Sequence, residues 1–212
     1  MGAVGAEAGI DGGPGRIGVL GGAFNPPHVG HLVLAEEALW QLELDAVVLV
    51  PTGIAPHKSI EDDPGAEVRV EMAELAVRGN RQLSVSRAEV DRPGPSYSFE
   101  TLELLGAQHP ESELCLLMGA DAALGFSGWK RPERIVELAK LGVAGRPGVD
   151  AAALRGSLEA SGAAGRVRVF EMPGLEISSS AVRGRVAAGH PVRYLLPAGV
   201  AELIEAKGLY RR

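Results

Sequence analysis

The feature that most constrains this chain is the string GGAFNPPHVGH at residues 21–31. An apolar run at residues 17–20 precedes it and predicts a buried strand. A helical pattern at residues 32–42 follows it, and one face of that helix carries Leu32, Ala35, Leu39 and Leu42. The string therefore predicts a strand-to-helix turn, in which prolines stiffen the chain and glycines let backbone N–H groups approach a ligand.

Such a turn is a place to bind phosphate, because a helix start presents free N–H groups and a partial positive charge. His28 and His31 lie three residues apart at that start, so both imidazoles can reach the same anion. The string lacks the end of a Walker loop and the third glycine of the dinucleotide fingerprint. A zinc site would need a nearby carboxylate or cysteine to complete it. A tight turn with a surface histidine pair is the plainer alternative.

The string resembles the Gly-Gly-Thr/Ser-Phe-Asp/Asn-Pro-x-His-x-Gly-His signature of the nucleotidyltransferase superfamily. That resemblance implies that His28 and His31 bind the phosphates of a nucleoside triphosphate and stabilise the transition state. The other ATP-binding residues that it implies in this turn are Gly21, Gly22, Ala23 and Phe24. Ala23 stands where the family usually has Thr or Ser, so its backbone N–H would serve in place of a hydroxyl.

Composition predicts one globular domain at residues 16–212, after a disordered tail at residues 1–15. The net charge is −6 and no dense basic block occurs, which argues against a nucleic-acid polymer as partner. The single cysteine, Cys115, lies in an apolar run, so we expect it to be a buried strand residue. A lone buried cysteine is typical of a protein in a reducing compartment. With no signal peptide and no apolar stretch long enough for a membrane span, we expect a cytoplasmic location.

Further apolar runs predict buried strands at residues 46–50, 83–86, 114–118, 141–144 and 167–170. Helices are predicted between them at residues 64–78, 132–138 and 149–161. One more helix is predicted to start with Ser98 as its N-cap. This alternation predicts a single Rossmann-like α/β domain, with a mostly parallel sheet, helices on both faces and right-handed crossovers. The active site of such a fold lies along the carboxyl ends of its strands.

A second phosphate pattern, ISSSAVR, occupies residues 177–183 at a predicted helix start. Serines there can simply cap the helix, but a cap needs only one serine and no arginine. Arg183 can grip phosphate oxygens with two parallel hydrogen bonds. The string resembles the Ile-Ser-Ser-Thr-x-Ile/Val-Arg motif of the same superfamily, and residues 188–197 with a final helix at 198–207 also resemble its tail. The ATP-binding residues implied here are Ile177, Ser178, Ser179 and Arg183.

Within the superfamily the chain is most similar, over residues 16–210, to the bacterial nicotinate-mononucleotide adenylyltransferase family. The strings that carry this are PHK at 56–58, PSYSFETL at 95–102, MGAD at 118–121, Trp129 and RPG at 146–148. Pantetheine-phosphate adenylyltransferases share both phosphate motifs but are shorter and lack the Ser-Tyr string and the Trp. Cytidylyltransferases have a different serine motif.

The resemblance implies a role for each string. Lys58 would be catalytic and, with Arg146, would hold the phosphates or the mononucleotide, while Gly119 and Asp121 would hold the adenosine ribose. Trp129 would stack on the pyridine ring of the substrate. The carboxylate on that ring would bind the Ser98 hydroxyl and the backbone N–H groups of Phe99 and Lys130. The family usually has Thr at the Ser98 position and often an aromatic residue at the Lys130 position. The alternatives are a core aromatic for Trp129, a helix N-cap for Asp121 and solvated side chains for the lysines.

The implied reaction moves the adenylyl group of ATP to nicotinate mononucleotide, giving nicotinate adenine dinucleotide and pyrophosphate in NAD biosynthesis. Mg²⁺ is expected to arrive with ATP, since no cluster of carboxylates is evident in the sequence. Nicotinamide mononucleotide and phosphopantetheine remain alternative acceptors. A nucleotide-binding sensor without turnover is the alternative from another class, and a homo-oligomer is left open.

Overall fold

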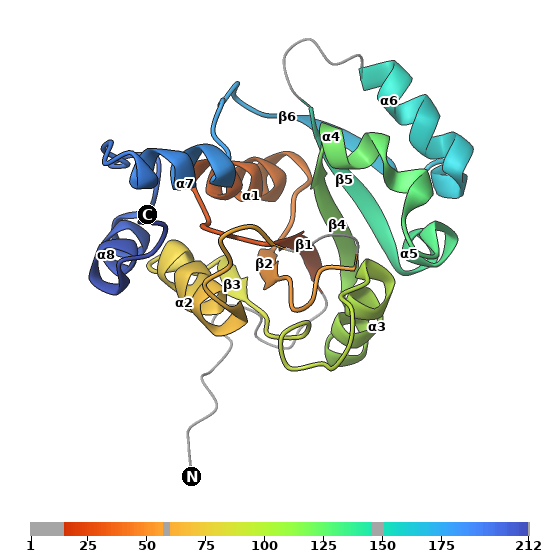
Figure 1. The fold of residues 1–212 in the computed structure, drawn as a ribbon. Helices are drawn as coiled ribbons and strands as arrows, with labels where there is room; N and C mark the ends of the chain where they lie inside the picture. The colour runs from red at the N-terminus through yellow and green to blue at the C-terminus, as the bar shows by residue number, and fades with distance from the viewer. Residues whose placement is uncertain (1–14, 57–59, 146–150, 212) are drawn as a thin grey trace.

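The computed structural model describes residues 15–56, 60–145 and 151–211 (Figure 1). Within them six strands form one sheet in the order β3-β2-β1-β4-β5-β6, and each neighbouring pair is parallel. The strands are β1 (Arg16–Gly22), β2 (Ala46–Pro51), β3 (Leu83–Val85), β4 (Glu113–Gly119), β5 (Ala139–Gly145) and β6 (Val167–Glu171). The predicted Rossmann-like fold class is confirmed.

Helices follow the strands in alternation. They are α1 (Val29–Gln41), α2 (Ala66–Val77), α3 (Ser98–Gln108), α4 (Ala120–Leu124), α5 (Pro132–Leu138), α6 (Ala151–Leu158), α7 (Ser179–Ala187) and α8 (Ala198–Lys207). Short helical turns lie at Phe126–Gly128 and Glu159–Ala163. Among the described helices, none is both long and apolar enough to cross a lipid bilayer.

The core forms because successive strand residues point to opposite faces of the sheet. On one face, Val19 and Leu116 belong to a cluster that includes side chains of α3, α4, α5 and α6. On the other, Leu20 and Leu117 pack with side chains of α1. A third cluster joins α2, α7 and α8 beside the sheet, as the left half of Figure 1 shows. Helices therefore cover both faces, as the sequence predicts.

The strand order places a topological switch point between β1 and β4. From β1 the chain builds outward through β2 to β3, and it then returns to add β4, β5 and β6 on the other side. In open α/β sheets ligands bind at such a point, outside the carboxyl ends of the strands, and we call this region the crevice. The turn after β1 leads to the two histidines, Gly119 ends β4, and Asp121 follows it in α4.

Several helix starts differ from the prediction, among them that of α2, which begins at Ala66 instead of residue 64. Helix α1 begins at Val29 instead of residue 32, so His28 is its N-cap and His31 lies in its first turn. The apolar pattern misses this turn because Gly30 and His31 carry no apolar side chain, and the pattern records only such side chains. Helix α3 has Tyr97 as its N-cap and Ser98 as its first residue, without a side-chain cap. Residues 1–14 of the predicted tail lie outside the described residues.

Candidate active site

The two signature histidines are stacked at the start of α1. Their ring centroids lie 3.8 Å apart with the planes 28° from parallel. The His28 backbone N–H donates to Nδ1 of His31 over 3.1 Å. Because Nδ1 of His31 accepts this hydrogen, the proton of the neutral imidazole lies on Nε2. His31 therefore offers an N–H donor from the ring edge opposite its backbone contact.

Burial makes both histidines weak bases. It lowers the pKa of His28 to about 4. The pKa of His31 falls to about 3, chiefly through burial and further through the neighbouring charge that His28 would carry. Both rings are thus neutral at pH 7. Nδ1 of His28 is buried and has no hydrogen-bond partner in the part of the chain that the structure describes. Gly30 leaves room for this ring, since a Cβ there would lie 3.0 Å from that nitrogen.

Phe24 fixes the turn from which the histidines emerge. Its ring is only 1% exposed and meets His31 edge to face, with centroids 5.1 Å apart. Its φ of 48° lies in the left-handed region, which a bulky residue rarely adopts. Phe24 therefore belongs to the core. Gly21 is exposed, and open space lies beside its Cα.

The second signature forms the first turn of α7 and is fastened to the histidine turn. The Ser178 hydroxyl accepts the Ala181 N–H over 3.1 Å and caps the helix. The Ser179 hydroxyl donates to the carbonyl of Pro26 over 2.8 Å, across 153 residues of sequence. Both hydroxyls are therefore used within the fold. The first N–H groups of a helix have no carbonyl partner within that helix, so those at the start of α7 can bind a ligand.

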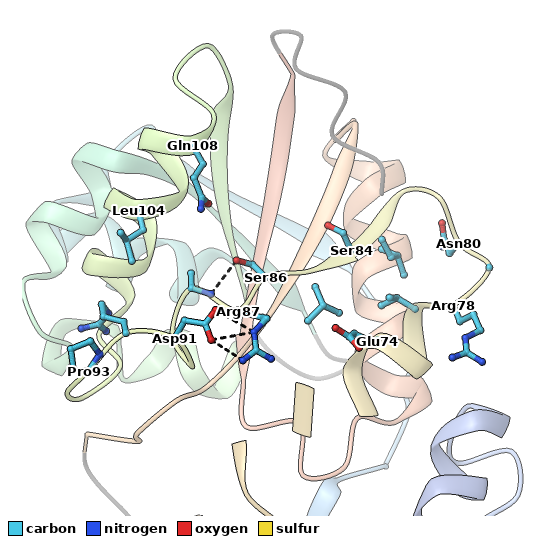
Figure 2. Close-up of a pocket in the computed structure, with 16 residues that line it drawn as sticks. Glu74, Arg78, Asn80, Ser84, Ser86, Arg87, Asp91, Pro93, Leu104 and Gln108 are labelled. Atoms are coloured by element: carbon cyan, nitrogen blue, oxygen red, sulfur yellow. Dashed lines mark hydrogen bonds and ion pairs between the residues drawn. The ribbon is translucent and has the colours of Figure 1, made fainter. Parts of the chain in front are cut away.

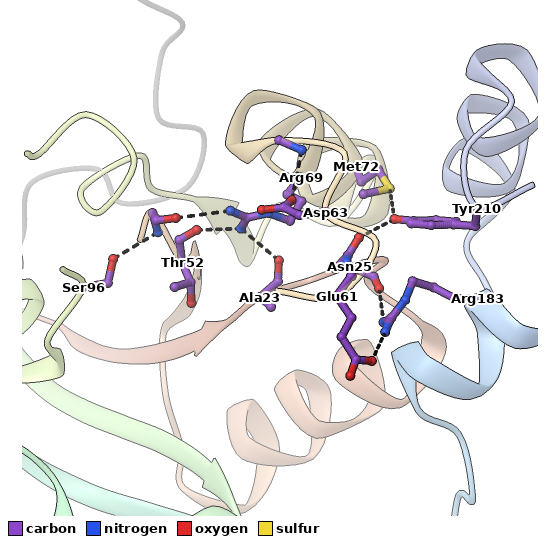
Figure 3. A network of polar contacts seen from close by, with 12 residues as sticks. Ala23, Asn25, Thr52, Glu61, Asp63, Arg69, Met72, Ser96, Arg183 and Tyr210 are labelled. Carbon is purple, nitrogen blue, oxygen red and sulfur yellow. Dashed lines mark hydrogen bonds and ion pairs between the residues drawn. The ribbon is translucent and has the colours of Figure 1, made fainter. Parts of the chain in front are cut away.

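Arg183 connects α7 to the histidine turn through a buried guanidinium (Figure 3). Its Nη1 donates to the Asn25 carbonyl over 3.0 Å. Its Nη2 and Nε pair with Glu61 and Asp62 over 3.2 and 3.3 Å. Those two carboxylates are 80% and 68% exposed, so they are well solvated and gain little from the pairing. A phosphate could replace them on the arginine.

Sequence reasoning missed several residues of this network. Asn25 donates to the Glu61 carbonyl over 2.7 Å and accepts the Tyr210 hydroxyl hydrogen over 2.6 Å. Arg69 is completely buried and binds the loops after β1 and β2. A signal for Arg69 exists, because it shares a helical face with Met72, Ala73 and Ala76, where a charge is out of place. Nothing in the sequence pattern singles out Tyr210.

The start of α3 and the segment after α4 come together at the other end of the crevice. The Lys130 ammonium lies 6.0 Å from the Tyr97 ring, and the Arg131 guanidinium 5.0 Å from the Phe99 ring. Trp129 is half-buried and packs on Phe126, with ring centroids 5.7 Å apart. Tyr97 and Phe99, at the start of α3, are thus brought beside Lys130 and Arg131. Ser98 lies between those two aromatic residues as the first residue of the helix.

The remaining predicted residues divide into two groups. Gly119 ends β4 next to β1 and is the N-cap of α4, so the alternative that Asp121 caps this helix is wrong. Asp121 lies in the first turn of α4. Lys58 and Arg146 lie outside the described residues. Among the residues that are described, no three His, Cys, Asp or Glu side chains gather closely enough to hold a metal ion.

An open groove of about 1190 Å³ lies elsewhere, along the edge strand β3 and between α2 and α3 (Figure 2). Arg87 within it is held by Glu67 and Asp91 over 2.8 and 2.7 Å. Neither signature histidine lines this groove. It is therefore separate from the crevice at the strand ends.

Comparisons with known proteins agree with the two signatures. A cytidylyltransferase-like family model matches residues 19–185. A protein of Roseiflexus sp., named as a probable nicotinate-nucleotide adenylyltransferase, is 45% identical over 92% of this chain and 98% of its own. Another of the same name, from Moorella thermoacetica, is 41% identical over 93% of each chain. The structure of a Plasmodium falciparum nicotinic acid mononucleotide adenylyltransferase complexed with NaAD matches with a TM-score of 0.73. At 16% identity, over 92% of this chain and 97% of that one, it bears on the fold alone.

Fold and signatures together define a nucleotidyltransferase with a cytidylyltransferase-like domain. Within that class, the chain belongs to the nicotinate-nucleotide adenylyltransferase family.

Proposed function

We propose that the chain catalyses nicotinate-nucleotide adenylyl transfer in NAD biosynthesis, in the crevice where α1 and α7 begin. The observation that carries this proposal is the joining of the two phosphate signatures by the Ser179–Pro26 and Arg183–Asn25 hydrogen bonds. The two contacts bring donors from both ends of the chain to one place. We call this region, with His28, His31 and Arg183, the triphosphate end.

The reaction is an in-line displacement at phosphorus. A 5′-phosphate oxygen of nicotinate mononucleotide forms a bond to the α-phosphorus of ATP, and the bond from that phosphorus to the β-bridging oxygen breaks. Pyrophosphate leaves with the bonding electron pair. The attacking oxygen is already an anion, so the reaction needs no general base, and catalysis comes from positioning and charge stabilisation.

The histidines act in this scheme as preorganised donors. His31 directs its Nε2–H outward because Nδ1 is occupied by the His28 N–H. A neutral ring can donate to a phosphoryl oxygen, and its pKa rises when an anion binds beside it. The developing charge on the α-phosphoryl oxygens would then be met by a donor whose position is set before the substrate arrives.

The leaving pyrophosphate is assigned to Arg183, the first-turn N–H groups of α7 and Lys58. The guanidinium would exchange the Glu61 and Asp62 carboxylates for β- and γ-phosphate oxygens, while keeping its bond to Asn25. The described residues form no metal site of their own. We therefore assign Mg²⁺ to the triphosphate itself, where it would neutralise part of the charge.

The other half of the crevice, with Ser98, Phe99, Trp129 and Lys130, is the pyridine end. The start of α3 offers free N–H groups and a positive dipole end to a carboxylate. The Trp129 ring is assigned to stack on the pyridine, with Arg146 on the mononucleotide. Gly119 and Asp121, beside β1, are assigned to the adenosine ribose.

Pyrophosphate release tests this function directly. The full chain with ATP, Mg²⁺ and nicotinate mononucleotide should release pyrophosphate and form the dinucleotide. Nicotinamide mononucleotide and phosphopantetheine serve as alternative acceptors under the same conditions. ATP binding without turnover on any acceptor would instead identify a nucleotide-binding sensor and contradict the proposal.

A further inference from the structure

The Arg69 guanidinium is a full positive charge buried in the fold, and its hydrogen bonds reach the loops beside the candidate active site. Its side chain, in the first turn of α2, is 0% exposed. Nη1 donates to the carbonyls of Ala23 and Thr52 over 3.1 and 2.6 Å, and Nη2 donates to that of Gly53 over 3.3 Å (Figure 3). Nε pairs with Asp63 over 2.9 Å. A buried guanidinium is costly, and three loop carbonyls hold this one in addition to Asp63, which calls for an explanation.

The carbonyls that Arg69 binds belong to the loops leaving β1 and β2. In a trans peptide the C=O and the following N–H point in opposite directions. By holding the Ala23 carbonyl, Arg69 turns the Phe24 N–H to the other side of the chain. No protein group in the described residues accepts that N–H. The same peptide leads into the left-handed Phe24 backbone.

The loop after β2 shows the same geometry, and there the protein itself supplies the acceptor for the N–H. Arg69 holds the Thr52 carbonyl, and the Gly53 N–H on the opposite side donates to the Ser96 hydroxyl over 3.0 Å. The loop comes so close to its neighbour that a Cβ on Gly53 would lie 2.2 Å from the Glu89 carbonyl oxygen. One guanidinium thus sets the peptide planes of both loops.

We propose that Arg69 is a positioning residue for adenylyl transfer, which holds the peptide between Ala23 and Phe24 so that its N–H and the His31 ring meet the ATP phosphates. The effect reaches His31 through the Phe24 ring, which contacts it edge to face. This proposal rests on the proposed function. Arg69 touches no substrate, because it is enclosed by protein.

The pyridine end touches the second loop at Ser96, whose hydroxyl accepts the Gly53 N–H and whose N–H donates to the Ile54 carbonyl over 2.8 Å. Its other supports do not involve Arg69. The Thr101 hydroxyl donates to the buried Glu89 carboxylate over 2.7 Å. Loss of the Arg69 fork should therefore disturb ATP binding much more than mononucleotide binding. A purely structural arginine would not produce such a split.

The test uses Arg69→Met, which keeps the length of the side chain and removes its donors, and Arg69→Lys, which keeps the charge but not the fork. Arg166→Met is the matched control, because Arg166 also binds a carbonyl, that of Val136 over 2.7 Å, but before β6 at the opposite edge of the sheet. The dissociation constants of ATP and of nicotinate mononucleotide are measured by calorimetry below each melting transition, together with kcat.

Both Arg69 variants should bind ATP at least about tenfold more weakly and lose at least about tenfold in kcat, with mononucleotide binding changed less than about threefold. Arg166→Met should lower the melting temperature alone. Unchanged ATP affinity in folded Arg69→Lys, or equal losses for both ligands, would overturn the proposal. If the wild type binds ATP but releases no pyrophosphate, the proposed function fails, while the ATP dissociation constants still decide the role of Arg69.

Discussion

The two ends of the crevice are built in different ways. At the triphosphate end, buried polar groups hold one another through contacts between distant segments, such as Arg183 with Asn25 and Tyr210 with Asn25. At the pyridine end, the exposed cations of Lys130 and Arg131 lie over the faces of the Tyr97 and Phe99 rings. A network of buried hydrogen bonds sets positions closely, whereas exposed charges on rings move with little cost. We therefore expect substitutions at the first end to affect catalysis, and differences between substrates to arise at the second.

The largest expected effect is at His31. His31→Ala should lower kcat about 100- to 1000-fold, because one preorganised donor to the transition state is lost. The melting temperature should change little, so the loss of kcat would not be due to unfolding. His190→Ala, at an exposed position after α7, is the control and should keep full turnover. Near-normal turnover of His31→Ala, or inactivity that only follows unfolding, would contradict the assignment.

The pyridine end should distinguish acid from amide. We expect kcat/KM for nicotinate mononucleotide to exceed that for nicotinamide mononucleotide by at least about 100-fold, since the helix start favours a carboxylate and an amide NH₂ would face N–H donors. Lys130→Ala should reduce this preference only a few-fold, because an exposed lysine contributes little. Both substrates are compared at the same salt and Mg²⁺ concentrations. Equal values in the wild type would show that the carboxylate pocket has been misassigned.

Arg183→Ala should weaken ATP binding about 10- to 100-fold and mononucleotide binding much less, as expected for the loss of a charge-assisted hydrogen bond of about 1.5–3 kcal/mol. Arg185→Ala is the matched control on the same helix, because the Arg185 guanidinium donates to the Pro191 carbonyl and contacts neither Glu61 nor Asp62. Calorimetric titration of each ligand measures both effects. An Arg183→Ala protein that binds ATP as the wild type does would remove Arg183 from the triphosphate end.

Acid should destabilise the triphosphate end through its histidines. The pKa of His28 is about 4 in the folded protein against 6.5 for the free side chain. Above pH 6.5 both states are neutral. Between pH 6.5 and 4 the unfolded chain takes up a proton that the folded chain does not, so stability falls as the pH falls, by up to about 1.4 kcal/mol per unit. Below pH 4 this contribution levels off.

His28→Gln should remove this contribution, so its free energy of unfolding should fall less than that of the wild type between pH 6.5 and 5.5. The difference should be up to about tenfold in the unfolding constant. Urea unfolding of both proteins at the two pH values measures it, and titration of other groups cancels in the comparison. Parallel pH profiles would mean that His28 is not neutral in the folded protein.

Much of the fold could be predicted from local patterns. The bounds of α8 and α5 coincide with those read from the sequence, because caps and apolar spacing mark helices locally. The start of α1 could not be predicted in this way, since Gly30 and His31 in its first turn carry no apolar side chain. The contacts of Arg69 could not be predicted either, because backbone carbonyls as partners have no sequence signal.

The sequence by itself determined the strand–helix alternation, the two phosphate signatures and the family, because each of these depends on residues close together in the chain. Only the tertiary structure decided that the Ser179 hydroxyl binds the Pro26 carbonyl and that Arg183 pairs with Glu61 and Asp62. It also decided that both histidines are neutral at pH 7. Burial and contacts across more than 100 residues set these properties, and neither is written in a local pattern.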